Sequence, residues 1–154
     1  WKAQGYSGTI IGYLWALGVV AEICMFAADK RFLQRFGAQS LFIAGAIGCV
    51  VRWVLLGAST ELWGLVLGQL LHSVTFGMSH LGAVRFMTRQ LPAEQLIPTQ
   101  ALYAALGLGM TVAALMAVCG VLFEPLGGGI FFLMVLVVLP VFVLRLREGE
   151  LKAA

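Results

Sequence analysis

Charged side chains are scarce in this sequence. Of its 154 residues, 11% are charged and 61% are hydrophobic, whereas soluble domains average about 25% charged and about 45–50% apolar residues. So few charges cannot cover a water-facing surface. Several apolar stretches are long enough for the hydrocarbon core of a bilayer, which is about 30 Å thick, and helices can cross it because they satisfy their own backbone hydrogen bonds. The sequence therefore predicts an all-α membrane protein and excludes an open β-sheet.

Motifs for cofactors, metals and enzymatic chemistry are also missing. Cys24, Cys49 and Cys119 lie one per hydrophobic stretch, without a Cys-x-x-Cys pair or metal-ligand spacing, which favours small buried apolar residues. The chain has no phosphate-binding loop, nucleophile elbow or His-Glu-x-x-His zinc motif. We therefore expect no cofactor, no metal site and no enzymatic activity.

Five hydrophobic stretches are separated by charged, proline-containing or glycine-rich segments. A loop is predicted over residues 88–95, with Pro92 and Pro98 as breakers, because a helix tolerates proline only in its first turn. Glu124 and Pro125 precede three glycines, which predicts a tight turn before the fifth. With an odd number of spans and Trp1 at the start, we expect a piece of a longer protein. The predicted transmembrane spans cover residues 8–28, 39–57, 62–86, 99–123 and 130–144.

Basic residues are distributed asymmetrically. Eight of the ten Lys and Arg residues close or follow the first, third or fifth span, which places all eight on one side of the membrane. Because Lys and Arg concentrate in cytoplasmic loops, we expect a cytoplasmic C-terminus and an outside N-terminus. The net charge of +3 follows from this asymmetry, so no nucleic-acid partner is needed to explain it. The eight residues are Lys30, Arg31, Arg35, Arg85, Arg89, Arg145, Arg147 and Lys152.

Two charged residues lie deep inside predicted spans, away from either end. Glu22 is in the first span, about 10 Å from the charged end at Asp29 at 1.5 Å per residue. Arg52 is in the second span, at a similar depth from Ser59. A charge near the bilayer centre costs about 2.5–3.5 kcal/mol on insertion scales, so both must face the protein interior or water. The two residues are candidates for function, or for an ion pair that only locks the first two spans together.

The third span carries a polar stripe. Gln69, His72, Phe76 and His80 are spaced by three or four residues, which places them on one helical face. A single intramembrane histidine is more often a hydrogen-bonded core residue than a proton carrier. Two histidines and a glutamine, with an acid and an arginine on other spans, favour a substrate or proton site.

Three further candidates lie on the first and fourth spans. Trp15 precedes Glu22 by two helical turns on the same face, so its ring can meet a substrate beside the acid. Gln100 and Tyr103 share a face near the start of the fourth span. A binding role and simple packing explain this last pair equally well.

Taken in order, these segments resemble the phenylpropionic acid permease family. That family belongs to the major facilitator superfamily, near the proton symporters for oligosaccharides and nucleosides. The superfamily's loop signature is present in part: Asp29 and Lys30 form its charged pair, and Met25 stands where a glycine is expected. The similar segments are 12–23, 51–53, 69–76 with His80, and 100–103.

The resemblance implies the C-terminal half of a twelve-helix transporter, with the end of helix seven at the start of the chain and then helices eight to twelve. Facilitators rock two halves around a central site, so this chain alone would not transport. A multi-pass protein of the bacterial inner membrane is implied. Its partners would be the lipid bilayer, protons, a small-molecule substrate and the missing N-terminal half.

For the complete protein, the resemblance implies proton-coupled uptake of a small aromatic carboxylic acid such as 3-phenylpropionate. Glu22 would bind the transported proton, since desolvation favours its neutral form and an approaching Arg52 favours its charged form. Arg52 would pair with a substrate carboxylate or with Glu22 in alternate conformations, and His72 would hydrogen-bond Glu22 or substrate. The expected substrate-binding residues are Trp15, Gln69, Phe76, His80, Gln100 and Tyr103.

Other functions use the same residues. Proton symport of nucleosides or sugars is the alternative substrate class, because Gln, His and Arg side chains suit hydroxyls as well as carboxylates. A non-transporting membrane scaffold would use the glycines and the ion pair for packing alone. An intramembrane enzyme would have only His72 and His80 with Glu22, which are dispersed over two spans.

Overall fold

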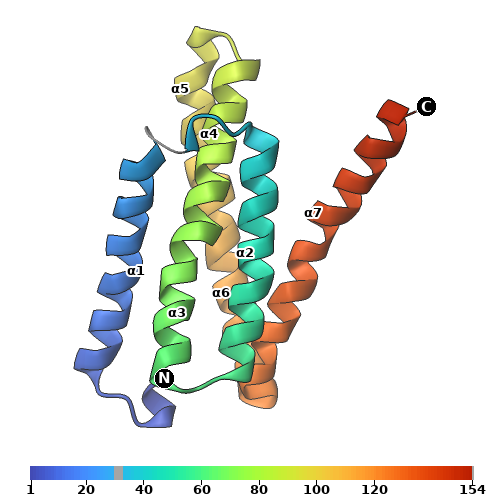
Figure 1. The fold of residues 1–154 in the computed structure, drawn as a ribbon. Helices are drawn as coiled ribbons and strands as arrows, with labels where there is room; N and C mark the ends of the chain where they lie inside the picture. Colours follow the sequence, from blue (N-terminus) through green and yellow to red (C-terminus); the bar gives the residue numbers. More distant parts are fainter. Residues whose placement is uncertain (30–32, 154) are drawn as a thin grey trace.

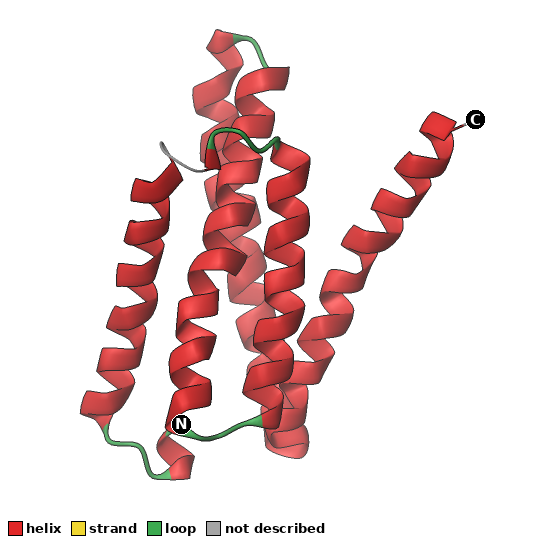
Figure 2. Ribbon diagram, viewed as in Figure 1, coloured by secondary structure: helices red, strands yellow, loops and turns green. Residues whose placement is uncertain are grey.

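The computed structural model describes residues 1–29 and 33–153, with side chains described through Phe142. The described residues form helices and connecting loops, with no strand among them (Figure 2). Long helical segments run up and down along the chain (Figure 1). Their bounds are η1 Lys2–Gln4, α1 Gly8–Ala28, α2 Ala38–Ala58, α3 Leu62–His72, the π-helical η3 Ser73–Gly77, α4 Met78–Gln90, α5 Ala93–Leu102, the π-helical η4 Tyr103–Met110, α6 Thr111–Leu126, the 3₁₀-helical η5 Gly127–Gly129 and α7 Ile130–Ala153.

Local sequence signals explain where these helices begin and reverse. Ser7 caps α1, because its hydroxyl accepts a hydrogen bond from the backbone N–H of Ile10. At the other end of the chain, Gly127 adopts a φ of 52° and a ψ of −132°, a conformation available essentially to glycine alone. The triple glycine therefore turns the chain from α6 back into α7, as Figure 1 shows.

The connections are shorter than the sequence analysis predicted. Only Leu91 and Pro92 separate α4 from α5, so the predicted loop over residues 88–95 is too long. Pro92 serves as the N-cap of α5, and Pro98 lies inside the helix beyond its first turn. Proline there removes one hydrogen bond and bends a helix without having to end it. Pro125 likewise lies inside α6, so the turn is confined to the glycines.

Within the described part of the chain, three stretches are long and apolar enough to cross a membrane, namely Gly8–Ala28, Ala38–Ala58 and Ala93–Phe142. The last is 50 residues long and contains two segments that reverse direction at η5 (Figure 1). The predicted third span falls within α3, η3 and α4 and is not among these stretches, because its polar stripe lowers its hydropathy. The all-α membrane architecture is confirmed, while membrane crossing by this polar segment stays a prediction.

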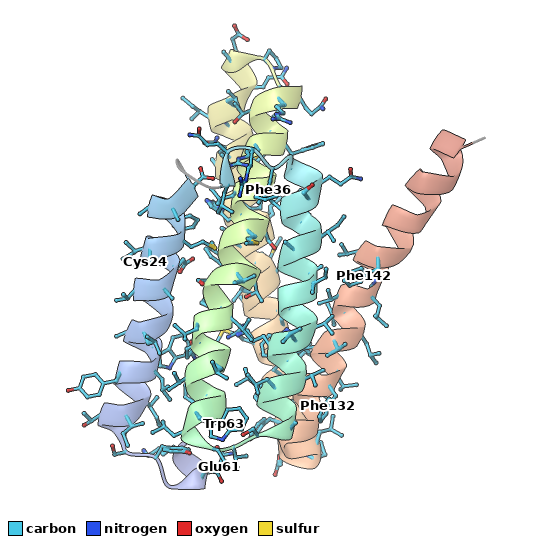
Figure 3. All side chains as sticks on the ribbon, in the orientation of Figure 1. Cys24, Phe36, Glu61, Trp63, Phe132 and Phe142 are labelled. Atoms are coloured by element: carbon cyan, nitrogen blue, oxygen red, sulfur yellow. The ribbon has the colours of Figure 1, made fainter. Side chains whose placement is uncertain are left out.

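Large apolar side chains point outward over most of the molecule (Figure 3). Tyr13, Ile97 and Val121 are 72%, 80% and 75% exposed. Exposed apolar surface of this extent belongs to a protein that is covered by lipid or by other helices rather than by water.

The densest packing involves α1, α2 and the α3–η3–α4 segment. α2 also packs against α7, which diverges from the other helices toward its C-terminal end. In Figure 1, α5 lies behind α4, and α6 lies further down, behind α2 and α3. Close approach of α2 to η3 and α4 depends on glycine: a Cβ on Gly48 would lie 2.8 Å from the Val74 side chain. A small core of Leu14, Leu56 and Leu65 joins α1, α2 and α3 at the end that holds the N-terminus.

Candidate functional site

A cavity of about 290 Å³ lies where α1, α2, α3 and the start of α7 meet. Trp15, Arg52, Gln69 and His72 line it, which is four of the nine predicted site residues. Its remaining walls are aromatic or aliphatic. They comprise Trp1, Val19, Trp53, Leu56 and Phe131.

Arg52 is anchored on one side only. Its Nε donates a hydrogen bond of 2.9 Å to the carbonyl of Gly68, and its guanidinium carbon lies 4.7 Å from the centroid of the Trp53 ring. Among the described residues, no carboxylate lies within ion-pair distance of it. The structure therefore does not form the anticipated pair with Glu22, and the remaining donors of this cation are available to an anion.

Gln69 and His72 supply further polar groups to the cavity wall. Gln69 is only 6% exposed and packs against α1, where a Cβ on Gly18 would lie 2.8 Å from its Oε1. The Nδ1 atom of His72 is buried and has no hydrogen-bond partner in the part of the chain that the structure describes. Leaving such an atom unsatisfied costs about 1–3 kcal/mol. A ligand or a water molecule in the cavity would remove that cost.

A ladder of stacked rings leads away from this cavity. His72 stacks on Phe76 with ring centroids 5.9 Å apart, and Phe76 stacks on His80 at 5.7 Å. His80 in turn stacks on Tyr103 at 5.7 Å, and its Nδ1 lies 3.4 Å from the Tyr103 hydroxyl. A spacing of four residues aligns the first three rings on one helical face. The ladder thus joins α3 and α4 to η4.

Glu22 lies near the far end of the ladder rather than beside Arg52. It is partly buried on α1. Phe26, one helical turn further along α1, meets the edge of the His80 ring with centroids 6.0 Å apart. The Glu22 carboxylate makes no hydrogen bond or ion pair with another described residue, so the anticipated hydrogen bond to His72 is not formed. The Gln100 side chain is exposed and lies outside both cavity and ladder.

Sequence reasoning missed the aromatic half of the cavity and its packing partner on α1. Trp53 and Phe131 stack with ring centroids 5.7 Å apart. The two positions are so distant in sequence that their spacing does not predict this contact. Trp53 is the direct neighbour of Arg52, and this adjacency was a usable signal. Gly18 lies between Trp15 and Glu22, and its role follows only from the approach of Gln69.

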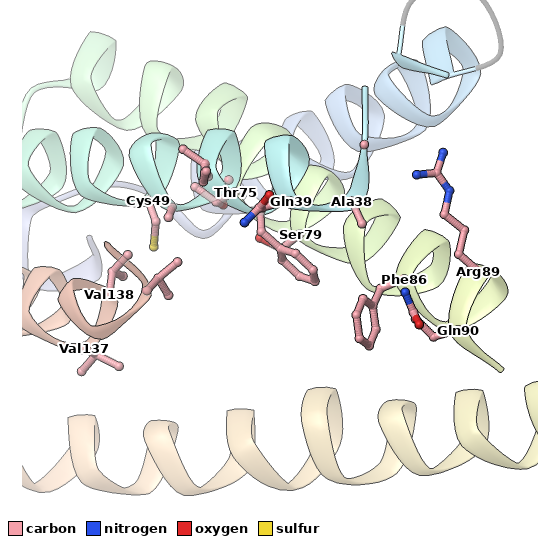
Figure 4. Close-up of a pocket in the computed structure, with 16 residues that line it drawn as sticks. Ala38, Gln39, Cys49, Thr75, Ser79, Phe86, Arg89, Gln90, Val137 and Val138 are labelled. Atoms are coloured by element: carbon pink, nitrogen blue, oxygen red, sulfur yellow. The ribbon is translucent and has the colours of Figure 1, made fainter. Parts of the chain in front are cut away.

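A larger groove of about 950 Å³ lies between α2, α4 and α7 (Figure 4). None of the predicted site residues lines it. Arg89 and Gln90 lie toward one end, and small or apolar side chains such as Cys49 and Val138 form much of the wall. Its polar side chains are Gln39, Thr75, Ser79, Arg89 and Gln90.

The sequence profile of the MFS_1 like family matches residues 1–134. The chain therefore belongs to this family of the major facilitator superfamily, and its long apolar helices make it a multi-pass membrane protein. This confirms the superfamily resemblance.

Individual relatives agree with that membership. The "Probable 3-phenylpropionic acid transporter" of Escherichia coli (strain K12) is 41% identical over 94% of this chain and 38% of its own length. The maltose permease of Geobacillus stearothermophilus is 28% identical over 96% of the chain and 38% of its own length. The chain thus spans about two fifths of the length of these relatives. No solved structure matches it significantly.

Proposed function

We propose that, in the complete protein, this chain forms one wall of the substrate path in a proton-coupled secondary transporter for small aromatic carboxylates such as 3-phenylpropionate. One observation carries the proposal: a partly buried arginine with donors to spare faces a cavity with aromatic walls. A carboxylate attached to a phenyl ring has the complementary chemistry.

Arg52 is suited to the carboxylate end of such a solute. A guanidinium presents its N–H groups as a planar fork that matches two carboxylate oxygens. Nε is already bonded to Gly68, which fixes the plane of the group and leaves its outer nitrogens for the ligand. Gln69 and His72 lie on the same wall and can complete the hydrogen bonding.

The aromatic side chains are suited to the ring of the solute. Trp15 contributes a wall from α1, and the stacked Trp53 and Phe131 contribute a second from α2 and α7. Offset or edge-to-face ring pairs contribute about 0.5–1.5 kcal/mol beyond area burial. A volume of about 290 Å³ is near the lower end of small-molecule pockets, about 300–1,000 Å³.

The distribution of charge and the family membership support an orientation in the membrane and a missing N-terminal half. Arg35, Arg85 and Arg89 gather at one end of the bundle, around the segment between α1 and α2. The positive-inside rule supports a cytoplasmic location for this end, and we propose that the C-terminus lies on the cytoplasmic side of a bacterial inner membrane. Lys30 and Arg31 lie outside the described residues, as do the side chains of Arg145, Arg147 and Lys152. An N-terminal half of the transporter would supply the opposite wall of the path.

Sugar transport is the second candidate. A relative at lower identity is a maltose permease, and Gln69 with His72 can hydrogen-bond hydroxyl groups as well as a carboxylate. The spare donors of Arg52 favour an anion over a neutral sugar, because a neutral solute would leave this cation uncompensated.

Uptake into vesicles containing the complete gene product tests the proposal. Labelled 3-phenylpropionate is offered beside a nucleoside and maltose, with and without an inward proton gradient. We expect accumulation of the aromatic acid that collapses when the proton gradient is dissipated. Accumulation of maltose or the nucleoside alone would show that the site takes a neutral, hydroxyl-bearing solute instead. Accumulation of none of the three would refute the transport assignment for these solutes.

A further inference from the structure

The groove of about 950 Å³ between α2, α4 and α7 is separate from the cavity at Arg52, which is the anion site of the proposed function. The two have no lining residue in common among the described residues. α7, which forms one wall of the groove, diverges from α2 toward its C-terminal end (Figure 1). In a bilayer, an open groove with a largely apolar wall is filled by lipid or by another helix rather than by water.

The groove has a polar end and an apolar end. Arg89 and Gln90, in the last turn of α4, lie at the first, and Cys49 lies beside Val138 of α7 at the second (Figure 4). Along α2, the lining extends from the start of the helix at Ala38 to Cys49. At 1.5 Å per residue this distance is about 16 Å, or about half of a hydrocarbon core about 30 Å thick. The groove therefore has the depth of one leaflet.

Charge at the polar end is of one sign. Among the described residues that line the groove, Arg89 is the charged one and none is acidic. The Arg89 side chain is exposed, and no carboxylate of a described residue lies within ion-pair distance of it. Arg85, one helical turn earlier, is already paired with Asp29. A guanidinium can bind two oxygens of a phosphate at once, so this end is complementary to an anionic phosphate group.

The deeper polar side chains do not form a second charged site. Thr75 and Ser79 lie 14 and ten residues before Arg89 in the chain, on the continuous helical segment that ends with α4. The Thr75 hydroxyl already donates a hydrogen bond of 2.9 Å to the carbonyl of His72. A cation at the membrane interface above a largely apolar wall matches a lipid, whose charge is confined to its headgroup, better than it matches a hydrophobic helix.

We propose that this groove binds an acidic phospholipid, with the phosphate at Arg89 and an acyl chain extending toward Val138. The basic residues at this end support a cytoplasmic location, and the cytoplasmic leaflet carries acidic lipids that attract basic residues near its surface. The site goes beyond the proposed function, because it holds a lipid between α2, α4 and α7 rather than the transported solute. It fills the space that opens where α7 leaves the other helices.

Photo-cross-linking of the complete protein in vesicles tests the site. The probe is phosphatidylglycerol with a diazirine group in one acyl chain, added below saturation to phosphatidylcholine vesicles, and mass spectrometry maps the adducts. We expect adducts on the groove-lining residues of α2 and α7, and stronger competition by unlabelled phosphatidylglycerol than by added phosphatidylcholine. Arg89→Gln should lower the adduct yield in the groove about fivefold, the contribution of one basic residue near an acidic membrane surface.

Two pairs of variants separate the headgroup from the chain. Arg35→Gln removes the same charge at the same end from a residue that does not line the groove, so its yield should equal that of wild type. Val138→Trp should block the path of the acyl chain and abolish groove adducts. Leu139→Trp is its control, because Leu139 is 45% exposed on the same helix and lies outside the lining. Thermal unfolding in detergent verifies that each variant is folded.

Several results would overturn the inference. They are equal losses in Arg35→Gln and Arg89→Gln, equal competition by the two lipids, or adducts spread evenly over all exposed helices. Absence of groove adducts in the folded wild-type protein would also overturn it, and would mean that another helix or a second copy of the chain fills the groove. No transported solute takes part in the experiment, so its outcome is independent of the proposed function.

Discussion

Two arginines in this chain have opposite surroundings. Arg85, near the end of α4, donates from Nη1 to the carbonyls of Leu33 and Phe36 at 2.7 Å each and pairs through Nη2 with the carboxylate of Asp29. Arg52, in the middle of α2, makes one hydrogen bond, from Nε to Gly68. The first is fully engaged by the protein, and the second is not.

The difference distinguishes an arginine that stabilises the fold from an arginine that is available to bind a ligand. Arg85 fastens the segment between α1 and α2 to the end of α4, so its contacts are complete without a ligand. A partly buried guanidinium with unused N–H groups is costly until an anion joins it. The comparison therefore predicts that removal of Arg85 affects stability, whereas removal of Arg52 affects binding.

Substitution Arg52→Gln should produce the largest effect on function. Removing one partner of a buried charge pair costs about 2–5 kcal/mol, which is a loss of about 30-fold or more in Kd. We expect this loss for 3-phenylpropionate, measured by isothermal titration or competition binding on the complete protein in detergent. The thermal unfolding temperature should change less than in Arg85→Gln, since one hydrogen bond to Gly68 and the contact with the Trp53 ring are lost.

Arg52→Lys sharpens this prediction. Lysine keeps the charge but lacks the planar fork, so its affinity should fall between those of wild type and Arg52→Gln. Affinity in Arg52→Lys equal to that in Arg52→Gln would show that geometry alone matters at this position. Wild-type affinity in Arg52→Gln would remove Arg52 from the site altogether.

Substitution Arg85→Gln should produce the opposite result. It leaves the Asp29 carboxylate and two backbone carbonyls without their donor. The side chains of the ion pair are 17% and 22% exposed, so we expect a loss of about 2–4 kcal/mol in unfolding free energy. Thermal denaturation in detergent measures it, and Kd should stay within about twofold of wild type.

Arg35→Gln is the matched control, because Arg35 lies at the same end and contacts only the Phe36 ring among described groups, at 5.3 Å. An exposed contact of this kind contributes about 0.5–1 kcal/mol at most. Equal destabilisation by both substitutions would mean that loss of positive charge, rather than the contacts of Arg85, is responsible.

Sequence alone predicted the structural features that depend only on the residues within one segment. Hydropathy gave the helical stretches, and the spacing of His72, Phe76 and His80 placed them on one face, because both properties are set within a single segment. The partners of Glu22 and Arg52 depend on how α1 and α2 are rotated against α4, which no single segment determines. The rule that proline breaks helices also misled, since Pro98 lies inside α5.

Substitution Gly18→Ala should have an intermediate effect on binding. Its Cβ would lie 2.8 Å from Oε1 of Gln69, so the amide must move within the cavity wall. We expect a cost of about 1 kcal/mol, roughly fivefold in Kd. Gly12→Ala on the same helix is the control, because a Cβ there meets nothing within 4 Å. Equal Kd values for both variants would show that Gln69 does not contribute to the anion site.

Substitution Gln100→Ala should have the smallest effect. Its side chain is exposed and lines neither the cavity nor the ladder, although sequence spacing pairs it with Tyr103. If the anion site is complete within the walls around Arg52, Kd should change by less than about twofold, as for surface substitutions in general. A loss comparable to that of Arg52→Gln would instead place Gln100 against substrate, on a surface that closes only when the rest of the transporter packs over α5.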